Sequence, residues 1–118
     1  MNAPTAPTRQ SDADYACKAD TLLAQIEATV DNWLQNDVVD IDSQRTGGLL
    51  ELSFPDRSKV IVNTQPPLQE VWLAARGGGF HFRWVGEHWV DTRDGSEFFA
   101  ALSAHASSQA GMQLRFSA

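Results

Sequence analysis

The sequence predicts an α+β fold, a two-layer sandwich in which two terminal helices pack on one face of a five- to six-stranded antiparallel sheet. Helical spacing of apolar residues occurs only near the two ends of the chain, and the segments between them alternate with the period of strands. The connections between these segments are short and rich in Gly or Pro, which favours hairpins over parallel crossovers. Both helices must then cover one face, so the other face is open to a partner.

The 118 residues have the composition of one globular domain, with 42% hydrophobic and 20% charged residues. No apolar run reaches the roughly 18 residues that a membrane span requires. The single cysteine, Cys17, cannot form an internal disulfide or an all-thiolate metal site. We expect a disordered tail at residues 1–10, which are rich in Pro and Thr and carry neither a signal peptide nor a transit sequence, and a folded intracellular domain at 11–118.

The first helix is predicted from Ser11 to about residue 36. Ser11 and Asp14 have the spacing of a capping box, in which a side chain accepts a bond from a backbone N–H of the first turn. The apolar residues that follow form one core-facing stripe: Tyr15, Ala19, Leu22, Leu23, Ile26, Val30 and Trp33. Asp20, Glu27 and Asp31 fall on a second stripe, so the helix has an apolar face and an acidic flank.

The first strand is predicted from Val38 to Asp42, because Val39 and Ile41 alternate with Asp40 and Asp42. Further strands are predicted at 49–54, 59–63, 68–75, 80–84 and 88–91, with a short helix as the alternative at 68–75. The second helix should begin after a cap at Asp94-Gly95-Ser96 and carry apolar residues at helical spacing: Phe98, Phe99, Leu102 and Ala106. The last residues, 112–116, are expected to pack back on the domain.

Negative charge is concentrated in one part of the chain. The net charge is −6, from 9 basic and 15 acidic residues. Nine of the acids but only two bases lie between Asp12 and Glu51, whereas six acids and six bases lie beyond Glu51. The balance argues against nucleic acid or an anionic membrane as a partner, because both bind clustered Lys and Arg. The acidic region should instead attract cations or a basic protein.

The carboxylates at the end of the first helix and in the first strand are the strongest candidates for metal chemistry. Asp31, Asp37, Asp40 and Asp42 can line one ridge, and hard cations such as Fe(III), Ca(II), Mg(II) and Mn(II) prefer oxygen ligands. Exposed carboxylates without a rigid loop should bind such a cation weakly and leave several waters on it. The alternative is a solvated acidic face that protects an edge strand from pairing.

The sequence contains few groups with the pattern of a catalytic site. It has no nucleophile elbow and no phosphate-binding loop. His81 and His88 lie on adjacent predicted strands and can face each other, but two histidines are weak evidence for zinc. A hydrolase that uses His81, His88 and Asp91 is one rival hypothesis. Cys17 is interpreted as an unreactive helix thiol.

Trp72 has two interpretations. If residues 68–75 form a strand, Val71 and Leu73 face the core and Trp72 lies on the open face, beside Asn63 and Gln65. An exposed tryptophan among amides is a plausible anchor for a protein partner. Burial under a helix is the other interpretation.

Many short segments, in the same order along the chain, resemble the bacterial frataxin family. The resemblance spans residues 14–116 and is carried by Ala19-Asp20, Asp31-Asn32-Trp33, Asp40-Ile41-Asp42, Gly47-Gly48, Asn63-Thr64-Gln65-Pro66-Pro67-Leu68, Val71-Trp72-Leu73-Ala74, Gly78-Gly79-Phe80-His81-Phe82, Trp89 and Asp94-Gly95. The frataxin fold is the same sandwich that the pattern of elements predicts.

The resemblance implies an iron-binding adaptor of iron–sulfur cluster assembly rather than an enzyme. It implies weak iron (Fe2+/Fe3+) binding through an acidic ridge on the first helix and first strand, made here of Glu27, Asp31, Asp37, Asp40 and Asp42. It implies docking on a cysteine desulfurase and an iron–sulfur scaffold protein through the sheet surface at Asn63, Gln65 and Trp72. A monomer in the bacterial cytoplasm is expected, with an iron-dependent oligomer as the alternative.

Two rival functions accompany this interpretation: an iron oxidase that uses the same ridge, and a small acidic interaction domain with no physiological metal. The chain also departs from the family's denser acidic run, because Leu34-Gln35-Asn36 and Val38-Val39 carry no charge and Gln44 stands where an acid is common. Fewer ligands imply a lower iron capacity and a weaker attraction for a basic partner.

Overall fold

The computed structural model describes residues 9–118, so most of the predicted tail at 1–10 lies outside the described residues. The elements in chain order are α1 (Asp12–Gln35), β1 (Asp42–Thr46), β2 (Leu49–Ser53), β3 (Lys59–Gln65), the 3-10 turn η1 (Pro66–Leu68), β4 (Glu70–Ala75), β5 (Gly78–Val85), β6 (His88–Asp91) and α2 (Phe98–Ala110).

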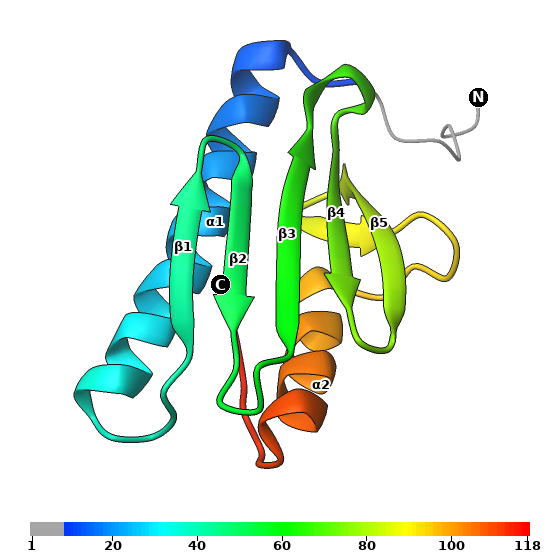
Figure 1. Cartoon of the computed structure of the whole chain (residues 1–118). Helices are drawn as coiled ribbons and strands as arrows, with labels where there is room; N and C mark the ends of the chain where they lie inside the picture. Colours follow the sequence, from blue (N-terminus) through cyan, green and yellow to red (C-terminus); the bar gives the residue numbers. More distant parts are fainter. Residues whose placement is uncertain (1–8) are drawn as a thin grey trace.

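The six strands form one sheet in the order β1-β2-β3-β4-β5-β6, and every neighbouring pair is antiparallel. Figure 1 shows both helices behind this sheet, which leaves the near face uncovered. We call the uncovered face the outer face. The predicted two-layer sandwich is therefore confirmed, with six strands. No helix within residues 9–118 is both long and apolar enough to cross a bilayer.

The predicted capping and apolar stripe of the first helix are confirmed. The Ser11 hydroxyl accepts a bond of 3.0 Å from the backbone N–H of Asp14 and satisfies one of the unpaired N–H groups of the first turn. Six residues of the predicted stripe are buried, namely Tyr15, Ala19, Leu22, Leu23, Ile26 and Val30, and Trp33 is partly buried against the same core. Burial of this stripe fixes α1 on the sheet.

The first strand begins four residues later than predicted, at Asp42 instead of Val38. The end of α1 accounts for the difference. The N–H of Val38 bonds to the carbonyl of Trp33 at 2.8 Å, and Asp37 adopts a left-handed conformation with φ 55°. This is the Schellman arrangement that ends many helices. Ile41 is then buried from an irregular segment, which explains why its apolar pattern resembled a strand.

Two other boundaries also differ from the prediction. The segment 68–75 is a strand, as the main interpretation held, but it begins at Glu70 because Gln69 is left-handed with φ 52°. The second helix is capped by Glu97, whose carboxylate accepts bonds from the N–H groups of Phe99 and Ala100, rather than by the predicted Asp94-Gly95-Ser96 cap. The Asp94 carboxylate accepts a bond from the N–H of Ser96 instead.

The C-terminal segment packs back on the domain, as predicted, in contact with both helices. Leu114 and Phe116 are buried, and the Phe116 ring meets Trp33 edge-on with centroids 4.8 Å apart. Ser103 and Ser107 of α2 bond to the backbone of Phe116 and Leu114 at 2.8 Å and 2.9 Å. Figure 1 shows this segment, in red, passing behind the sheet. The segment therefore links the end of α1 to α2.

Tyr15 joins the helical layer to the sheet through its hydroxyl group. The hydroxyl donates to the carbonyl of Glu70 at 2.6 Å and accepts from the N–H of Gln65 at 3.1 Å. Gln65 and Glu70 are opposite residues of β3 and β4, so one side chain of α1 bonds to both strands. Burial raises the pKa of the Tyr15 phenol, and the negative charge of Glu70 raises it further, against the bond from Gln65, which lowers it.

Tyr15→Phe should lower the free energy of unfolding by about 1–3 kcal/mol, because the ring still packs while one buried and one partly buried peptide group lose their partner. The raised pKa also means that stability contributed by Tyr15 is complete below the ordinary tyrosine pKa of about 10 and is lost as the pH rises through the higher folded value. Urea unfolding at neutral pH measures the first effect.

A phenolate absorbance titration measures the second effect directly, because Tyr15 is the chain's only tyrosine. The native midpoint should lie above that of the urea-unfolded chain. A native midpoint equal to or below the unfolded one would contradict the buried, bridging hydroxyl.

Candidate functional site

Six side chains of the outer face form two adjacent rows across β3, β4 and β5. Opposite residues in an antiparallel pair point to the same face. The register therefore places Asn63, Trp72 and His81 in one row. It places Gln65, Glu70 and Arg83 in the next row. The three predicted docking residues thus lie together on one face. Glu70, His81 and Arg83 lie among them, and the sequence did not assign these three to the site.

Trp72 lies on the outer face, so its predicted alternative position under a helix is wrong. Its side chain is half-buried, whereas Val71 and Leu73 on either side are fully buried in the core. The Trp72 ring stacks on the His81 ring with centroids 4.1 Å apart and an angle of 5° between the planes. One face of the indole ring is therefore covered by the His81 ring.

Glu70 is a buried carboxylate on an otherwise open sheet face. Only 10% of its side chain is exposed. One oxygen, Oε1, accepts a bond of 2.9 Å from the Trp72 indole N–H, and the other, Oε2, accepts from the Arg83 guanidinium at 3.2 Å. The His81 ring nitrogen Nδ1 lies 3.8 Å from Oε1. Both carboxylate oxygens thus have partners, and Arg83 compensates the negative charge.

The sequence assigned no role to Glu70, although period-two alternation along β4 places it on the same face as Trp72. The same period-two rule, applied to β5, would have placed His81 and Arg83 together on the outer face, because Phe80 and Phe82 alternate with them. The pairing of β4 with β5, which brings Arg83 opposite Glu70, requires the register and is not visible in the sequence.

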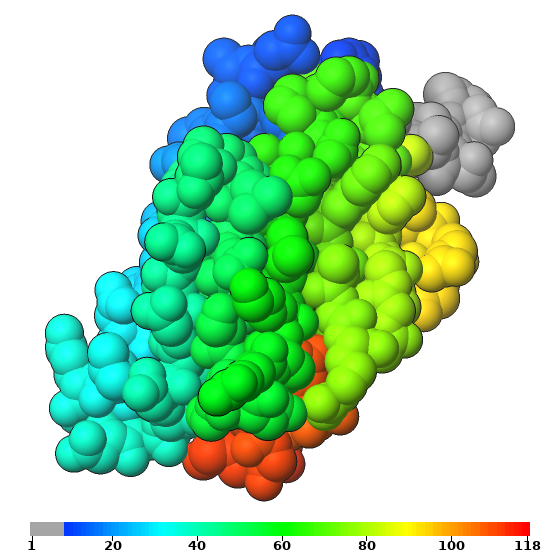
Figure 2. Space-filling view, viewed as in Figure 1, coloured from blue at the N-terminus to red at the C-terminus, as the bar shows by residue number. Residues whose placement is uncertain are grey.

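A shallow hollow of about 200 Å3 lies beside Trp72 on the sheet. Asn63, Ile61, Ala74 and His81 contribute to its walls together with the indole. Figure 2 shows the outer face from the front, with no helix over the central strands. The hollow is large enough to receive one side chain of a partner next to the indole.

The acidic ridge, defined here as Asp31, Asp37, Asp40 and Asp42, runs from the last turns of α1 to the first residue of β1. All four side chains are exposed, and none of them forms an ion pair with another described residue. Figure 2 shows the end of α1 and the segment that leads to β1, in cyan, forming one corner of the molecule. The ridge thus presents uncompensated negative charge to solvent.

Glu27, the fifth predicted ligand, is in a different environment from the ridge. Arg45 of β1 bonds to the Glu27 carboxylate at 2.9 Å and also to Asp20 on the same helix flank. Burial alone would lower the pKa of Arg45, but its bonds to these two carboxylates outweigh that effect and raise it. Arg45 therefore offsets only part of the negative charge of Glu27 and Asp20, because one guanidinium faces two carboxylates. The ion pair of Arg45 with Glu27 was not visible in the sequence, because 18 residues separate the two.

Within residues 9–118, no three side chains of His, Cys, Asp or Glu converge where they could hold one metal ion. The ridge carboxylates are spread along one edge instead of surrounding a point. A cation at the ridge would therefore contact one or two carboxylates and keep most of its waters. Such an arrangement fits hard, oxygen-seeking cations and does not fit a tightly held structural metal.

The predicted opposition of His81 and His88 is wrong. His81 pairs with Trp72 across β4 and β5, whereas His88 pairs with Val85 at the turn of the next hairpin. Asp91 is buried, and its carboxylate accepts bonds from backbone N–H groups of the turn that follows β6. The three residues of the hydrolase hypothesis are therefore not assembled into one site.

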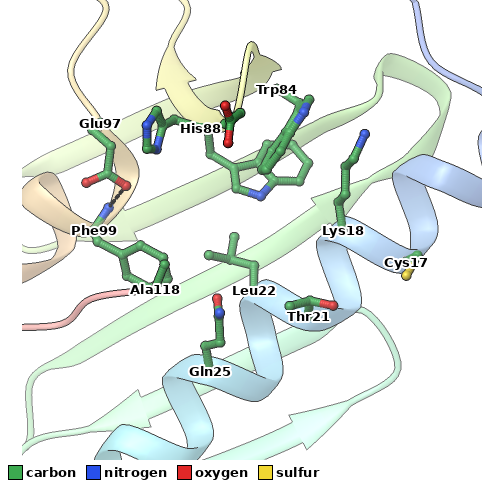
Figure 3. A pocket seen from close by; sticks show the side chains of 12 residues that line it. Cys17, Lys18, Thr21, Leu22, Gln25, Trp84, His88, Glu97, Phe99 and Ala118 are labelled. Carbon is green, nitrogen blue, oxygen red and sulfur yellow. Dashed lines mark hydrogen bonds between the residues drawn. The ribbon is translucent and has the colours of Figure 1, made fainter.

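His88 instead lines a pocket of about 190 Å3 on the helix side of the sheet (Figure 3). Trp84 forms one wall, with the Lys18 ammonium 5.0 Å from its ring centroid. Glu97 and Cys17 also line the pocket, but Glu97 caps α2 and Cys17 is exposed. The pocket contains no pair of groups arranged as a nucleophile and its base within the described residues.

Two terminal helices on one face of a six-stranded antiparallel sheet, with an acidic corner and an open face, are the architecture of a frataxin-like domain. A family model for the frataxin-like domain matches residues 8–112, and the chain belongs to this family. The "Iron-sulfur cluster assembly protein CyaY" of Burkholderia mallei is 53% identical over 108 residues, which cover 92% of this chain and 99% of that protein.

Two other relatives agree. The Polaromonas protein of the same name is 48% identical and aligns with 92% of this chain and 93% of its own length. The solved structure of frataxin from Psychromonas ingrahamii, described as part of the CyaY protein family, superposes with a TM-score of 0.82 at 33% identity. It covers 92% of this chain and all of that chain. The resemblance found in the sequence is thus confirmed.

Trp72→Ala should lower the free energy of unfolding by only about 1–2 kcal/mol, because the lost contacts are one stacking pair and one bond at the surface. Trp89→Ala is the matched control. Trp89 is 4% exposed in the core, and its truncation should cost about 3–5 kcal/mol. Chemical unfolding of both variants measures the difference. Equal losses would mean that Trp72 is part of the core.

Proposed function

We propose that this protein is an adaptor of iron–sulfur cluster assembly that has no turnover of its own. The observation that carries the proposal is the 53% identity to a protein named for iron–sulfur cluster assembly, over 99% of that protein's length. An adaptor needs surfaces more than a catalytic pocket, and the outer face and the acidic ridge are two such surfaces. We place its action in the bacterial cytoplasm, as a monomer, with an iron-dependent oligomer as the alternative.

The proposed iron site is the acidic ridge. Its exposed carboxylates are uncompensated, and their oxygens suit Fe2+ and Fe3+ when most of the ion's waters remain. Glu27 belongs to the same helix flank but is bonded to Arg45, so we assign it at most a secondary part in binding. Weak, exchangeable binding is what a protein that carries or senses iron requires. Here iron is cargo and not a permanent cofactor.

The proposed docking partner is a cysteine desulfurase together with its scaffold protein. The acidic ridge would attract a basic patch at long range, and electrostatic attraction of this kind mainly raises the association rate. Trp72, flanked by Asn63 and Gln65, would supply the short-range contact, because buried tryptophans are frequent hot spots of interfaces. The two surfaces thus take different parts in one binding event.

Two rival functions would use the same acidic ridge. An iron oxidase requires ligands that hold the metal during electron transfer, and residues 9–118 contain no cluster of three such groups. An acidic interaction domain without a physiological metal would leave the ridge with a purely electrostatic function. Iron titration separates this last reading from the proposal.

Iron addition should broaden or shift the amide resonances of residues 31–42, with weak, exchangeable binding, because the ridge is the exposed oxygen-rich surface. Asp40→Asn combined with Asp42→Asn should reduce this response strongly. Cys17→Ser should leave the iron affinity unchanged within about threefold, since the ligands are oxygens. Two-dimensional NMR during the titration is the measurement. A response centred on His81 and His88 would contradict the assignment to the ridge.

Asp40→Lys combined with Asp42→Lys should slow association with the desulfurase and reduce its dependence on salt, because the ridge provides long-range attraction. Trp72→Ala should act mainly on dissociation, with a loss of about 1–3 kcal/mol in binding if the indole is a hot spot. Surface plasmon resonance at two salt concentrations distinguishes the two effects.

The control for charge is Asp12→Lys combined with Glu87→Lys, which changes the net charge equally but away from the ridge. This control should change the association rate much less than the ridge variant. If both double variants slow association to the same extent, net charge and not the ridge governs encounter. If Trp72→Ala binds with unchanged kinetics, the outer face is not the docking surface.

A further inference from the structure

We propose that Glu70 is a positioning residue that holds the Trp72 indole in the orientation needed for docking. The inference rests on the proposed function of the outer face and goes beyond it, because it identifies what fixes the anchor. The inference is based on the hydrogen bonds and the ion pair of one buried carboxylate, that of Glu70.

The indole N–H of Trp72 is held by a hydrogen bond within the chain. Trp72 and Glu70 lie two residues apart on β4 and point to the same face. The Trp72 Nε1–H donates to Glu70 Oε1 at 2.9 Å. A tryptophan on a strand can rotate about two side-chain bonds, and this hydrogen bond selects one of the possible orientations.

The Glu70 carboxylate is itself held in place. Glu70 Oε2 accepts from Arg83 on the neighbouring strand at 3.2 Å, and 10% of the Glu70 side chain is exposed. The Arg83 side chain is 45% exposed, so its guanidinium can balance the charge of the buried Glu70 carboxylate and still contact water. A buried carboxylate with both oxygens bonded has little freedom to move.

The stack with His81 also restrains the indole. The His81 imidazole lies on β5, the strand that also carries Arg83. It covers one face of the indole, with ring centroids 4.1 Å apart. The bond to Glu70 fixes the edge of the indole, and the stack fixes its plane. The free parts of Trp72 are therefore its second ring face and its outer edge, next to the hollow lined by Asn63 and Ile61.

This arrangement determines what Trp72 offers to a partner. The indole N–H is already bonded within the chain, so a partner contacts apolar ring surface and not the polar group. An indole that is already oriented loses less side-chain freedom on binding than a mobile one. The partner segment that fits is an apolar side chain that enters the hollow beside the ring.

The test compares Glu70→Leu, Glu70→Gln and the control Glu51→Leu. Leucine fills the space but accepts no bond, whereas glutamine keeps an oxygen acceptor and loses the charge. Glu51 is a second glutamate of the sheet, paired with Lys59 on β3 at 3.0 Å, and within residues 9–118 it forms no hydrogen bond with Trp72. Glu70→Ala replaces Glu70→Leu if the leucine variant does not fold.

The first readout needs no partner: hydrogen exchange of the Trp72 indole N–H by NMR, with the signal assigned from its loss in Trp72→Phe. Glu70→Leu should speed this exchange by about tenfold, as expected for loss of one hydrogen bond, while Glu70→Gln and Glu51→Leu stay close to wild type. Unchanged exchange in Glu70→Leu, or in Glu70→Ala, would overturn the inference.

The second readout is the dissociation rate from the cysteine desulfurase encoded in the same genome. Glu70→Leu should dissociate about three- to tenfold faster, with rescue in Glu70→Gln. Faster indole exchange with unchanged dissociation would overturn the role of Glu70 in docking. If Trp72→Phe and Trp72→Ala also dissociate at the wild-type rate, the proposed docking face itself is wrong. The result of the indole exchange measurement stands in that case, because it is made without a partner.

Discussion

Both helices pack on the same face of the six-stranded sheet, and the candidate docking residues of the outer face owe their position to that packing. Since alternate residues of a strand point to opposite faces, burying Val71 and Leu73 under the helices places Glu70 and Trp72 outside. The Tyr15 hydroxyl strengthens the same arrangement, because it bonds to the backbone of Gln65 and of Glu70 where β3 and β4 meet. Tyr15, which bonds α1 to the sheet, thus lies behind the ends of β3 and β4 that carry Gln65 and Glu70 on the outer face.

The two surfaces differ in whether their charged side chains are paired. On the outer face, the buried carboxylate of Glu70 is matched by Arg83 and by the indole N–H, which gives a fixed and nearly neutral cluster. At the acidic ridge, the carboxylates of Asp31, Asp37, Asp40 and Asp42 are exposed without basic partners among the described residues. Arg45 lies between the two kinds of surface, because it pairs with Glu27 and Asp20 next to the ridge and offsets part of their charge. A fixed neutral cluster suits close contact, and an unmatched acidic edge suits attraction at a distance.

The sequence was sufficient to predict the layers of the fold, because helical and period-two spacing report directly on burial. It misplaced the start of β1, since Ile41 is buried from an irregular segment that follows the left-handed Asp37. The resemblance to frataxins pointed to the ridge and to Trp72, but not to the contacts that govern them. Arg45 with Glu27, and Arg83 with Glu70, join residues of different elements, so they depend on strand register and on helix position, which periodicity does not determine.

The most direct test of this account is a double-mutant cycle on desulfurase binding that combines Asp40→Lys and Asp42→Lys with Trp72→Ala. Three strand spacings separate β1 from β4, about 14 Å, so the two surfaces should act independently. The account predicts that the losses in binding free energy add within about 0.5 kcal/mol, with the ridge variant acting on association and Trp72→Ala on dissociation. A coupling energy well above that value, or a single surface that accounts for both rate changes, would contradict the division of docking between an acidic ridge and a fixed tryptophan.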